Sequence, residues 1–242
     1  MVTSVAIVGS SGRMGGLIDQ LLTAGEHFDV HARIGRGDSL EQLDGADVVI
    51  DVSAPAVSPG VVEAALDRRI PIVVGTSGWT TDRIAPVAAR IAADPELTAL
   101  FIPNFSLGSA LATRFAELAA PHFESIEIIE AHHAGKTDSP SGTAIRTAEL
   151  IGAARTELGP VAAPHADQRA RGQQVASVPV HSMRMSGVSA RQEVVFGGSG
   201  ETVRIVHETL SDESYEPGIL LALTAATPGA GLVVGLGALL GL

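Results

Sequence analysis

Residues 5–15 read Val-Ala-Ile-Val-Gly-Ser-Ser-Gly-Arg-Met-Gly, and this stretch decides the fold of the first half of the chain. The apolar run predicts a short strand that ends at Gly9, and a helical pattern follows over residues 14–22. Glycine lets the backbone approach a ligand closely, and a helix start can face a pyrophosphate. The spacing is Gly-x-x-Gly-x-x-Gly rather than the commoner G-x-G-x-x-G, so a tight glycine turn made for packing is the alternative.

The same strand-then-helix pattern continues to about residue 106. Short apolar runs alternate with segments of helical periodicity, and Gly or Pro residues separate them. Strands alternating with helices at this pitch predict a parallel sheet with helices on both faces. The expected strands are 46–52, 70–74 and 97–102, and the expected helices are 61–66 and 84–93.

After about residue 106 strands follow one another without helices between them. This favours an α+β unit with an open, mostly antiparallel sheet, whose free edges and uncovered face favour an oligomer. We expect helices at 109–120 and 143–154, a strand at 126–130, a loop at 157–173, and strand-like runs at 175–185, 188–196 and 201–208.

Composition narrows the classes of function. The formal net charge of the 242 residues is −11, which disfavours nucleic acid as a partner. Cysteine is absent, so disulfides, thiol catalysis and thiolate metal sites are excluded. The first residues lack the basic region of a signal peptide. The apolar stretch from Ile219 is broken by Pro228 and glycines, short of the roughly 18 unbroken apolar residues of a membrane span. We expect a soluble cytoplasmic protein.

Residues 130–144 read Glu-Ala-His-His-Ala-Gly-Lys-Thr-Asp-Ser-Pro-Ser-Gly-Thr-Ala and carry most of the chemistry. Imidazole can deliver a proton near neutral pH. Lys136 and the free N–H groups of the helix that begins near Ser141 can hold carboxylates or phosphates. The segment therefore predicts a site for an acidic small molecule that must be protonated.

Each of these residues also has a plainer explanation. Adjacent histidines on an extended chain point in different directions, so at most one of His132 and His133 is the proton donor. Ser141 can serve as a helix cap alone. A metal site on the two histidines would find a third ligand only in Glu130 or Asp138, and the nearby Lys136 would repel a cation. We expect no metal.

The region that would bind the cofactor's ribose is unusual. In the usual nicotinamide site an acidic residue about 20 positions after the glycines binds the ribose hydroxyls. Residues 31–36 read His-Ala-Arg-Ile-Gly-Arg and contain no carboxylate. Arg33 and Arg36, with Arg13 in the loop, suit a 2′-phosphate. Our hypothesis is that NADPH is favoured, or at least not disfavoured; the alternative is that these arginines are solvated loop charges.

Taken together, these motifs resemble the 4-hydroxy-tetrahydrodipicolinate reductase family, also called dihydrodipicolinate reductase, of diaminopimelate and lysine biosynthesis. The resemblance covers nearly the whole chain. The matching stretches are the glycine loop at 9–15, Gly-Thr-Ser-Gly at 75–78, Pro-Asn-Phe-Ser-Leu-Gly at 103–108, the segment 130–144, Gln-Glu-Val-Val-Phe-Gly at 192–197 and Pro-Gly at 217–218.

The resemblance implies a Rossmann-like dinucleotide-binding domain over 1–106 and 215–242. It also implies an α+β substrate-binding domain over 107–214, which forms a homotetramer through an open mixed sheet. The expected reaction is the NADPH- or NADH-dependent reduction of a cyclic dicarboxylate, with hydride added at C4. His132 would be the acid and Lys136 its charge-stabilising partner. The expected substrate-binding residues are His133, Ser141, Gly142 and Thr143. The expected cofactor-binding residues, besides Arg33, are Gly9, Ser10, Ser11, Gly12, Arg13, Met14, Gly75, Thr76, Ser77, Ile102, Pro103, Asn104 and Phe105.

Two positions depart from the family pattern. Many members carry an acidic residue where this chain has Gly35, and several carry an arginine where it has Asp212. The first puts NADH use in doubt, and the second removes a possible contact with the substrate. Another nicotinamide-dependent reductase of the same two-domain plan, or a non-catalytic dinucleotide sensor, are the alternative functions.

Overall fold

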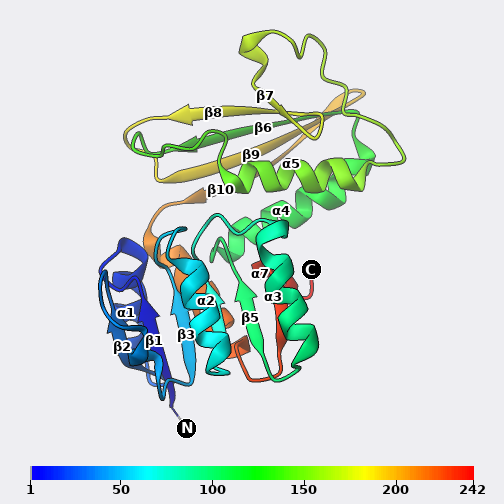
Figure 1. Ribbon diagram of the computed structural model, residues 1–242. Coiled ribbons are helices and arrows are strands. Elements are labelled where there is room, and N and C mark those ends of the chain that lie inside the picture. The colour runs from blue at the N-terminus through cyan, green and yellow to red at the C-terminus, as the bar shows by residue number, and fades with distance from the viewer. Residues whose placement is uncertain (1) are drawn as a thin grey trace. The chain divides into compact units, whose positions relative to one another are not determined.

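The computed structural model describes residues 2–242. It divides into two compact units, each with its own sheet (Figure 1). The first unit consists of the segment ending at Leu107 together with Tyr215–Leu242, and the second of Gly108–Ser214.

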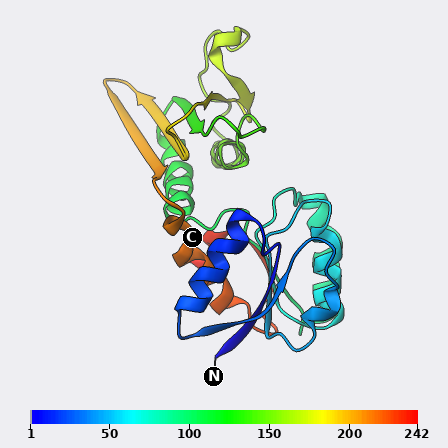
Figure 2. The same cartoon turned by 90° about the vertical axis from the view of Figure 1, so that its left-hand side faces the viewer.

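The first unit contains a six-stranded sheet in the order β11-β5-β4-β3-β1-β2, and every pair of neighbours is parallel. Figure 2 shows α1 and α6 on one face of this sheet and α2 and α3 on the other. The strands are β1 Thr3–Val8, β2 Phe28–Ile34, β3 Val48–Asp51, β4 Ile72–Val74, β5 Thr98–Phe101 and β11 Gly231–Val234. The helices are α1 Arg13–Ala24, α2 Ser58–Asp67, α3 Thr81–Ala93, α6 Glu216–Ala225 and α7 Leu236–Leu239, with a 3₁₀ turn η1 at Leu40–Leu43.

Helices on both faces explain the sequence of the central strands. All residues of β3, β4 and β5 are buried, because a parallel sheet covered on both sides has no solvent face. The expected parallel sheet is confirmed. Two edge strands, β2 and β11, were not expected. In β2 exposed Asp29, His31 and Arg33 alternate with less exposed residues, so its apolar run is broken.

The second unit contains a five-stranded mixed sheet in the order β10-β9-β6-β8-β7, in which only β6 and β8 run parallel. Helix α5 lies along one face (Figure 1), and residues of α5, β6, β8 and β9 form a common core. The strands are β6 Ser125–His132, β7 Gln173–Val175, β8 Val178–Arg184, β9 Ala190–Gly198 and β10 Glu201–Thr209. The helices are α4 Leu107–Ala119 and α5 Gly142–Ala154, with 3₁₀ turns η2 Ala120–His122, η3 Arg169–Arg171 and η4 Asp212–Tyr215.

Three local differences from the sequence-based expectation matter. Strand β6 extends to His132 instead of ending at Glu130. The single run expected at 175–185 is two strands, because Ala176 and Ser177 adopt positive φ angles of 47° and 71° in a tight turn. The apolar C-terminal stretch divides into α6 and β11. Across residues 2–242 no helix combines the length and apolarity that crossing a membrane requires.

Candidate active site

The glycine loop between β1 and α1 needs glycine at its two ends. Gly9 has a φ of 90°, and a Cβ there would lie 2.6 Å from the carbonyl oxygen of Val52. A Cβ on Gly15 would lie 2.2 Å from the carbonyl oxygen of Gly9. The packing alternative therefore accounts for these two glycines, because neither position has room for a side chain.

The middle of the loop fits a phosphate. Gly12 is the N-cap of α1 and has no side chain that could occupy the first N–H groups of the helix. The first turn of α1 contains no acidic residue, and Ser11, Gly12 and Arg13 are exposed. A helix start with no side-chain cap and no competing carboxylate is suited to a pyrophosphate.

The other two predicted cofactor segments lie at the same edge of the sheet. Gly75 follows β4 and donates its N–H to the backbone carbonyl oxygen of Asp51 (2.8 Å). Ile102 follows β5 and donates its N–H to the backbone carbonyl oxygen of Val74 (2.8 Å). Gly9 follows β1 and donates to Ile34 (2.8 Å). Since all these strands are parallel, their carboxyl ends meet at one edge, where such folds bind nucleotides.

These turns are also tightly packed. A Cβ on Gly75 would lie 2.6 Å from a ring carbon of Phe105, and Thr76 is buried. Asn104 accepts the N–H of Ser106 through its side-chain oxygen at 2.9 Å. Among the remaining predicted residues, Ser77 and Pro103 are exposed.

At the expected ribose position, the structure provides the carboxylate that residues 31–36 lack. Gly35 directly follows β2, and its N–H donates to Oδ2 of Asp38 at 2.8 Å. Arg33, predicted to favour a 2′-phosphate, is paired with Asp19 on α1 through Nη2–Oδ1 (2.6 Å) and Nε–Oδ2 (2.9 Å). This edge therefore carries both a carboxylate and a partly neutralised guanidinium.

In the second unit a buried carboxylate organises the predicted catalytic segment. Glu130 and His132 lie two residues apart on β6, so both side chains point to the same face of the sheet. The Glu130 side chain is fully buried, and its Oε2 lies 2.6 Å from Nδ1 of His132. Arg184, the last residue of β8, donates to both oxygens of Glu130 at 2.9 and 2.8 Å.

The start of α5 contacts the same carboxylate. Ser141 is the N-cap: its hydroxyl accepts the N–H of Ala144 at 3.2 Å, and its own N–H donates to Glu130 Oε1 at 3.2 Å. The expected capping role of Ser141 is therefore observed. Gly142, which is exposed, and Thr143 form the first turn of the helix.

Lys136 and His133 occupy the turn after β6. The Lys136 ammonium forms an ion pair with Asp138 (Nζ–Oδ1, 2.7 Å), and its side chain is 22 % exposed. His133 is exposed, whereas His132 is half-buried, so the two rings occupy different surroundings as expected for adjacent residues on an extended chain. Among residues 2–242, His, Asp and Glu side chains do not form a group of three that could hold a metal ion.

The protonation of this cluster follows from burial and charge. Burial alone would raise the pKa of Glu130, but hydrogen bonds from Arg184, Ser182 and His132 outweigh it and the pKa is lowered. Burial lowers the pKa of His132 below its ordinary 6.5, Glu130 opposes this, and Lys136 and Arg184 add to it. Glu130 is therefore ionised and His132 is mainly neutral at neutral pH.

Sequence reasoning missed Arg184 and the part played by Glu130. The i, i+2 spacing of Glu130 and His132 is a signal for one face of a strand, but the strand was expected to end at Glu130. Arg184 had no local signal, because only the β6–β8 register, which pairs it with His132, brings it to the site.

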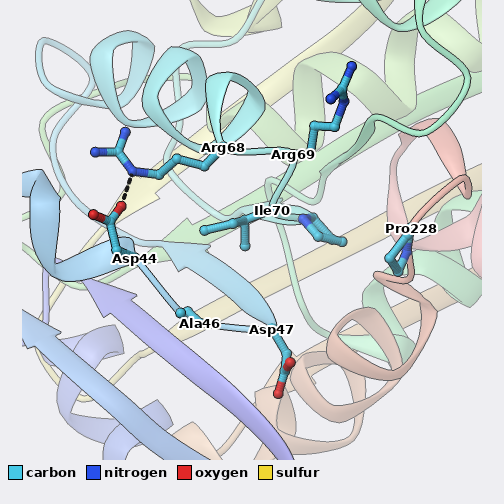
Figure 3. A pocket seen from close by; sticks show the side chains of 9 residues that line it. Asp44, Ala46, Asp47, Arg68, Arg69, Ile70 and Pro228 are labelled. Carbon is cyan, nitrogen blue, oxygen red and sulfur yellow. Dashed lines mark hydrogen bonds and ion pairs between the residues drawn. The ribbon is translucent and has the colours of Figure 1, made fainter.

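A surface cavity of about 480 Å³ lies elsewhere in the first unit (Figure 3). Its lining segments precede β3 and β4, so it lies at the amino ends of the strands, opposite the glycine loop. Its Arg68 is already paired with Asp44 (Nε–Oδ1, 2.6 Å). None of the predicted site residues is among its lining residues, which are Asp44, Gly45, Ala46, Asp47, Arg68, Arg69, Ile70, Pro71 and Pro228.

Comparison with known proteins identifies the family. Residues 3–105 match the N-terminal model, and residues 108–240 the C-terminal model, of dihydrodipicolinate reductase. The chain belongs to the dihydrodipicolinate reductase family. The 4-hydroxy-tetrahydrodipicolinate reductase of Clavibacter michiganensis subsp. michiganensis is 55% identical, over 100% of this chain and 87% of its own length. That of Streptomyces avermitilis is 43% identical, over 96% and 95%.

A solved structure shares the whole fold. Dipicolinate-bound dihydrodipicolinate reductase from Paenisporosarcina sp. TG-14 has a TM-score of 0.84 and 27% identity, and the match covers 98% of this chain and 99% of that one. Family membership confirms the resemblance seen in the sequence, an oxidoreductase activity and the cofactor class, NADPH and/or NADH. The roles assigned to individual residues remain predictions.

Proposed function

We propose that this chain catalyses the NADPH- or NADH-dependent reduction of 4-hydroxy-tetrahydrodipicolinate to tetrahydrodipicolinate in diaminopimelate and lysine biosynthesis. The observation that carries the proposal is the cluster in which His132 contacts buried Glu130 beside Lys136 and the start of α5. The curated relatives' names and the dipicolinate bound to the related structure support the choice of a cyclic dicarboxylate.

The residues of the second unit suit two carboxylates. One short segment offers three kinds of donor: the imidazole of His133, the ammonium of Lys136, and backbone N–H groups in the first turn of α5 at Gly142 and Thr143. Such donors bind carboxylates and stabilise negative charge that grows during the reaction. Lys136 is held by Asp138, so binding exchanges that partner for the substrate.

The chemistry places one proton on His132. Loss of water from the 4-hydroxy substrate leaves a conjugated cyclic imine. When bound, the reduced nicotinamide supplies the hydride that is added at C4. The displaced electron pair moves toward C3 and the imine, and a proton from His132 completes the product. A dianionic substrate raises the pKa of His132, which counteracts the lowering caused by burial and brings the ring into its acidic form.

The first unit would hold the cofactor. Gly9 to Met14 would bind the pyrophosphate, with the turns at 75–77 and 102–105 along the same sheet edge. Arg33 and Asp38 would lie near the ribose, and we propose that both NADPH and NADH bind. Arg33, Arg36 and Arg13 favour a 2′-phosphate, and the Asp38 carboxylate can accept a ribose hydroxyl.

We further propose a homotetramer in the cytoplasm, formed through the second unit. Strand alternation puts Met183 and Val206 on the sheet face opposite α5, and both are about half exposed, at 46% and 49%. A sheet face with exposed apolar side chains suits a second copy of this chain. If this face forms the interface, replacing Val206 by a charged residue should give smaller species than wild type in sedimentation velocity.

One assay tests the reaction. The purified protein is mixed with NADPH or NADH, aspartate semialdehyde, pyruvate and the synthase that precedes it, and cofactor oxidation is followed at 340 nm. We expect oxidation that depends on both carbon substrates, with tetrahydrodipicolinate identified by mass spectrometry. Oxidation only with another cyclic imine would indicate a different reductase, and cofactor binding without turnover would indicate a sensor.

A further inference from the structure

Glu130 is a buried charge that the proposed reaction does not use directly. Its side chain has no exposed surface, and burying an isolated carboxylate is costly. Arg184, Ser182, Ser141 and His132 all donate to it or lower its pKa, so the carboxylate is ionised. An ionised carboxylate only accepts hydrogen bonds.

This fixes the tautomer of His132. Because Glu130 can only accept, the Nδ1 atom at 2.6 Å carries the hydrogen. The other nitrogen, Nε2, is then the atom that gains and loses the exchangeable proton. The same division of labour is found wherever a carboxylate orients a catalytic imidazole.

Arg184 fixes the carboxylate in turn. Its two terminal nitrogens reach both oxygens of Glu130, and they also donate to the carbonyl oxygens of Met183 and Asp138, each at 2.6 Å. A two-point contact sets the plane of the carboxylate as well as its position. The charged groups that face His132 are therefore Glu130 from β6, Arg184 from β8, and Lys136 from the turn.

We propose that Glu130 is a positioning residue: held by Arg184, it keeps the hydrogen of His132 on Nδ1, so that Nε2 is the nitrogen that protonates the substrate. The inference rests on the proposed function for its catalytic consequence. The tautomer itself is a property of the second unit and can be measured without substrate.

The test uses the full-length Glu130→Gln variant. A glutamine keeps the size of the side chain but removes the charge and adds N–H donors, so the Nδ1–H form of His132 loses its preference. In ¹⁵N spectra of His132, assigned by loss of its signals in His132→Gln, we expect the neutral ring to move from the Nδ1–H to the Nε2–H form. We expect kcat to fall by about 10²-fold or more, the scale of general acid catalysis, with little change in NADPH affinity.

The matched control is Glu127→Gln. Glu127 lies on the same strand but on the other face, and it also contacts a histidine and an arginine: His181 at 2.8 Å, and Arg171. We expect the kcat of this variant to stay within about threefold of wild type and its His132 spectrum to be unchanged, because Glu127 points to the opposite face of β6 from His132.

The charge of Glu130 also acts on the pKa of His132. Glu130→Gln removes the group that raises this pKa, so the pH profile of kcat/KM should move to lower pH. A Glu130→Gln variant with the wild-type tautomer and pH profile overturns the proposal, even if its activity is low. If that variant does not fold, Glu130→Asp is used instead, because it keeps the charge but shortens its reach. The wild-type protein also gives a test by itself: a neutral His132 ring in the Nε2–H form overturns the proposal. If wild type shows the Nδ1–H form but no turnover, the proposed function fails and the tautomer assignment stands.

Discussion

His132 and Arg184 are paired in register on the parallel strands β6 and β8, and both contact the same buried carboxylate. Their side chains lie on the α5 side of the sheet, where the backbone N–H of Ser141, the N-cap of α5, donates a further hydrogen bond to that carboxylate. The imidazole proposed as the proton donor is therefore held by two strands and the start of a helix, although its own segment ends in an exposed turn.

Replacing His132 by glutamine tests the proton donor. We expect kcat to fall by about 10²-fold or more, because glutamine has no acidic proton to deliver. Steady-state kinetics with the coupled assay measures this loss. His133→Gln is the control, and we expect it to change KM more than kcat. Near-normal kcat in His132→Gln would remove its assigned role.

Lys136→Ala should also lower kcat by about 10²-fold, since an ammonium near developing negative charge contributes on that scale. Lys136→Arg keeps the charge and should recover part of the loss. Asp138→Ala removes the partner of Lys136 but no substrate contact, so its kcat should change far less. Equal losses in Lys136→Ala and Asp138→Ala would indicate that the ion pair, not the free ammonium, matters.

The pH dependence follows from the lowered pKa of His132. The reaction needs the protonated form of His132. In the protein without substrate, burial moves the pKa of His132 below 6.5, so kcat/KM should decline as pH rises through this lowered pKa. A bound dianion raises the pKa of His132, so the decline in kcat should lie at higher pH than the decline in kcat/KM. Coincident profiles would contradict this interpretation.

Cofactor preference should depend on Asp38. Asp38→Asn can still accept the N–H of Gly35 but loses the negative charge that repels a 2′-phosphate. We expect the ratio of NADPH to NADH affinity, measured by quenching of intrinsic or cofactor fluorescence, to rise about tenfold. Glu41→Gln, on the neighbouring 3₁₀ turn, is the control, and an equal ratio in both variants would exclude this role of Asp38.

The glycine loop offers a matched pair of substitutions in α1. Gly15→Ala places a Cβ 2.2 Å from the Gly9 carbonyl oxygen, whereas Gly16→Ala meets no atom within 4 Å. We expect Gly15→Ala to lower Tm by several degrees, and NADPH affinity by about tenfold or more, because the loop must shift. Gly16→Ala should leave binding intact and stabilise the helix by about 0.5–1 kcal/mol.

Some features of the site could be predicted because their signals are local. Within one strand–turn–helix unit, Gly9 adopts a φ of 90° and Gly15 packs against the carbonyl oxygen of Gly9. Ser141 caps the helix that starts directly after it. One local feature was not expected. The carboxylate near Gly35 comes from Asp38, three residues further along the chain, when the turn after β2 folds back.

The sequence by itself determined the parallel sheet of the first unit, the glycine loop and the reactive segment at 130–144, because each is encoded by neighbouring residues through periodicity, glycine placement and capping. Only the tertiary structure decided which distant group completes the surroundings of His132. Arg184 is more than fifty positions away along the chain, and strand register alone brings it to Glu130. Register is set by the packing of the whole sheet on α5, and no local pattern carries that information.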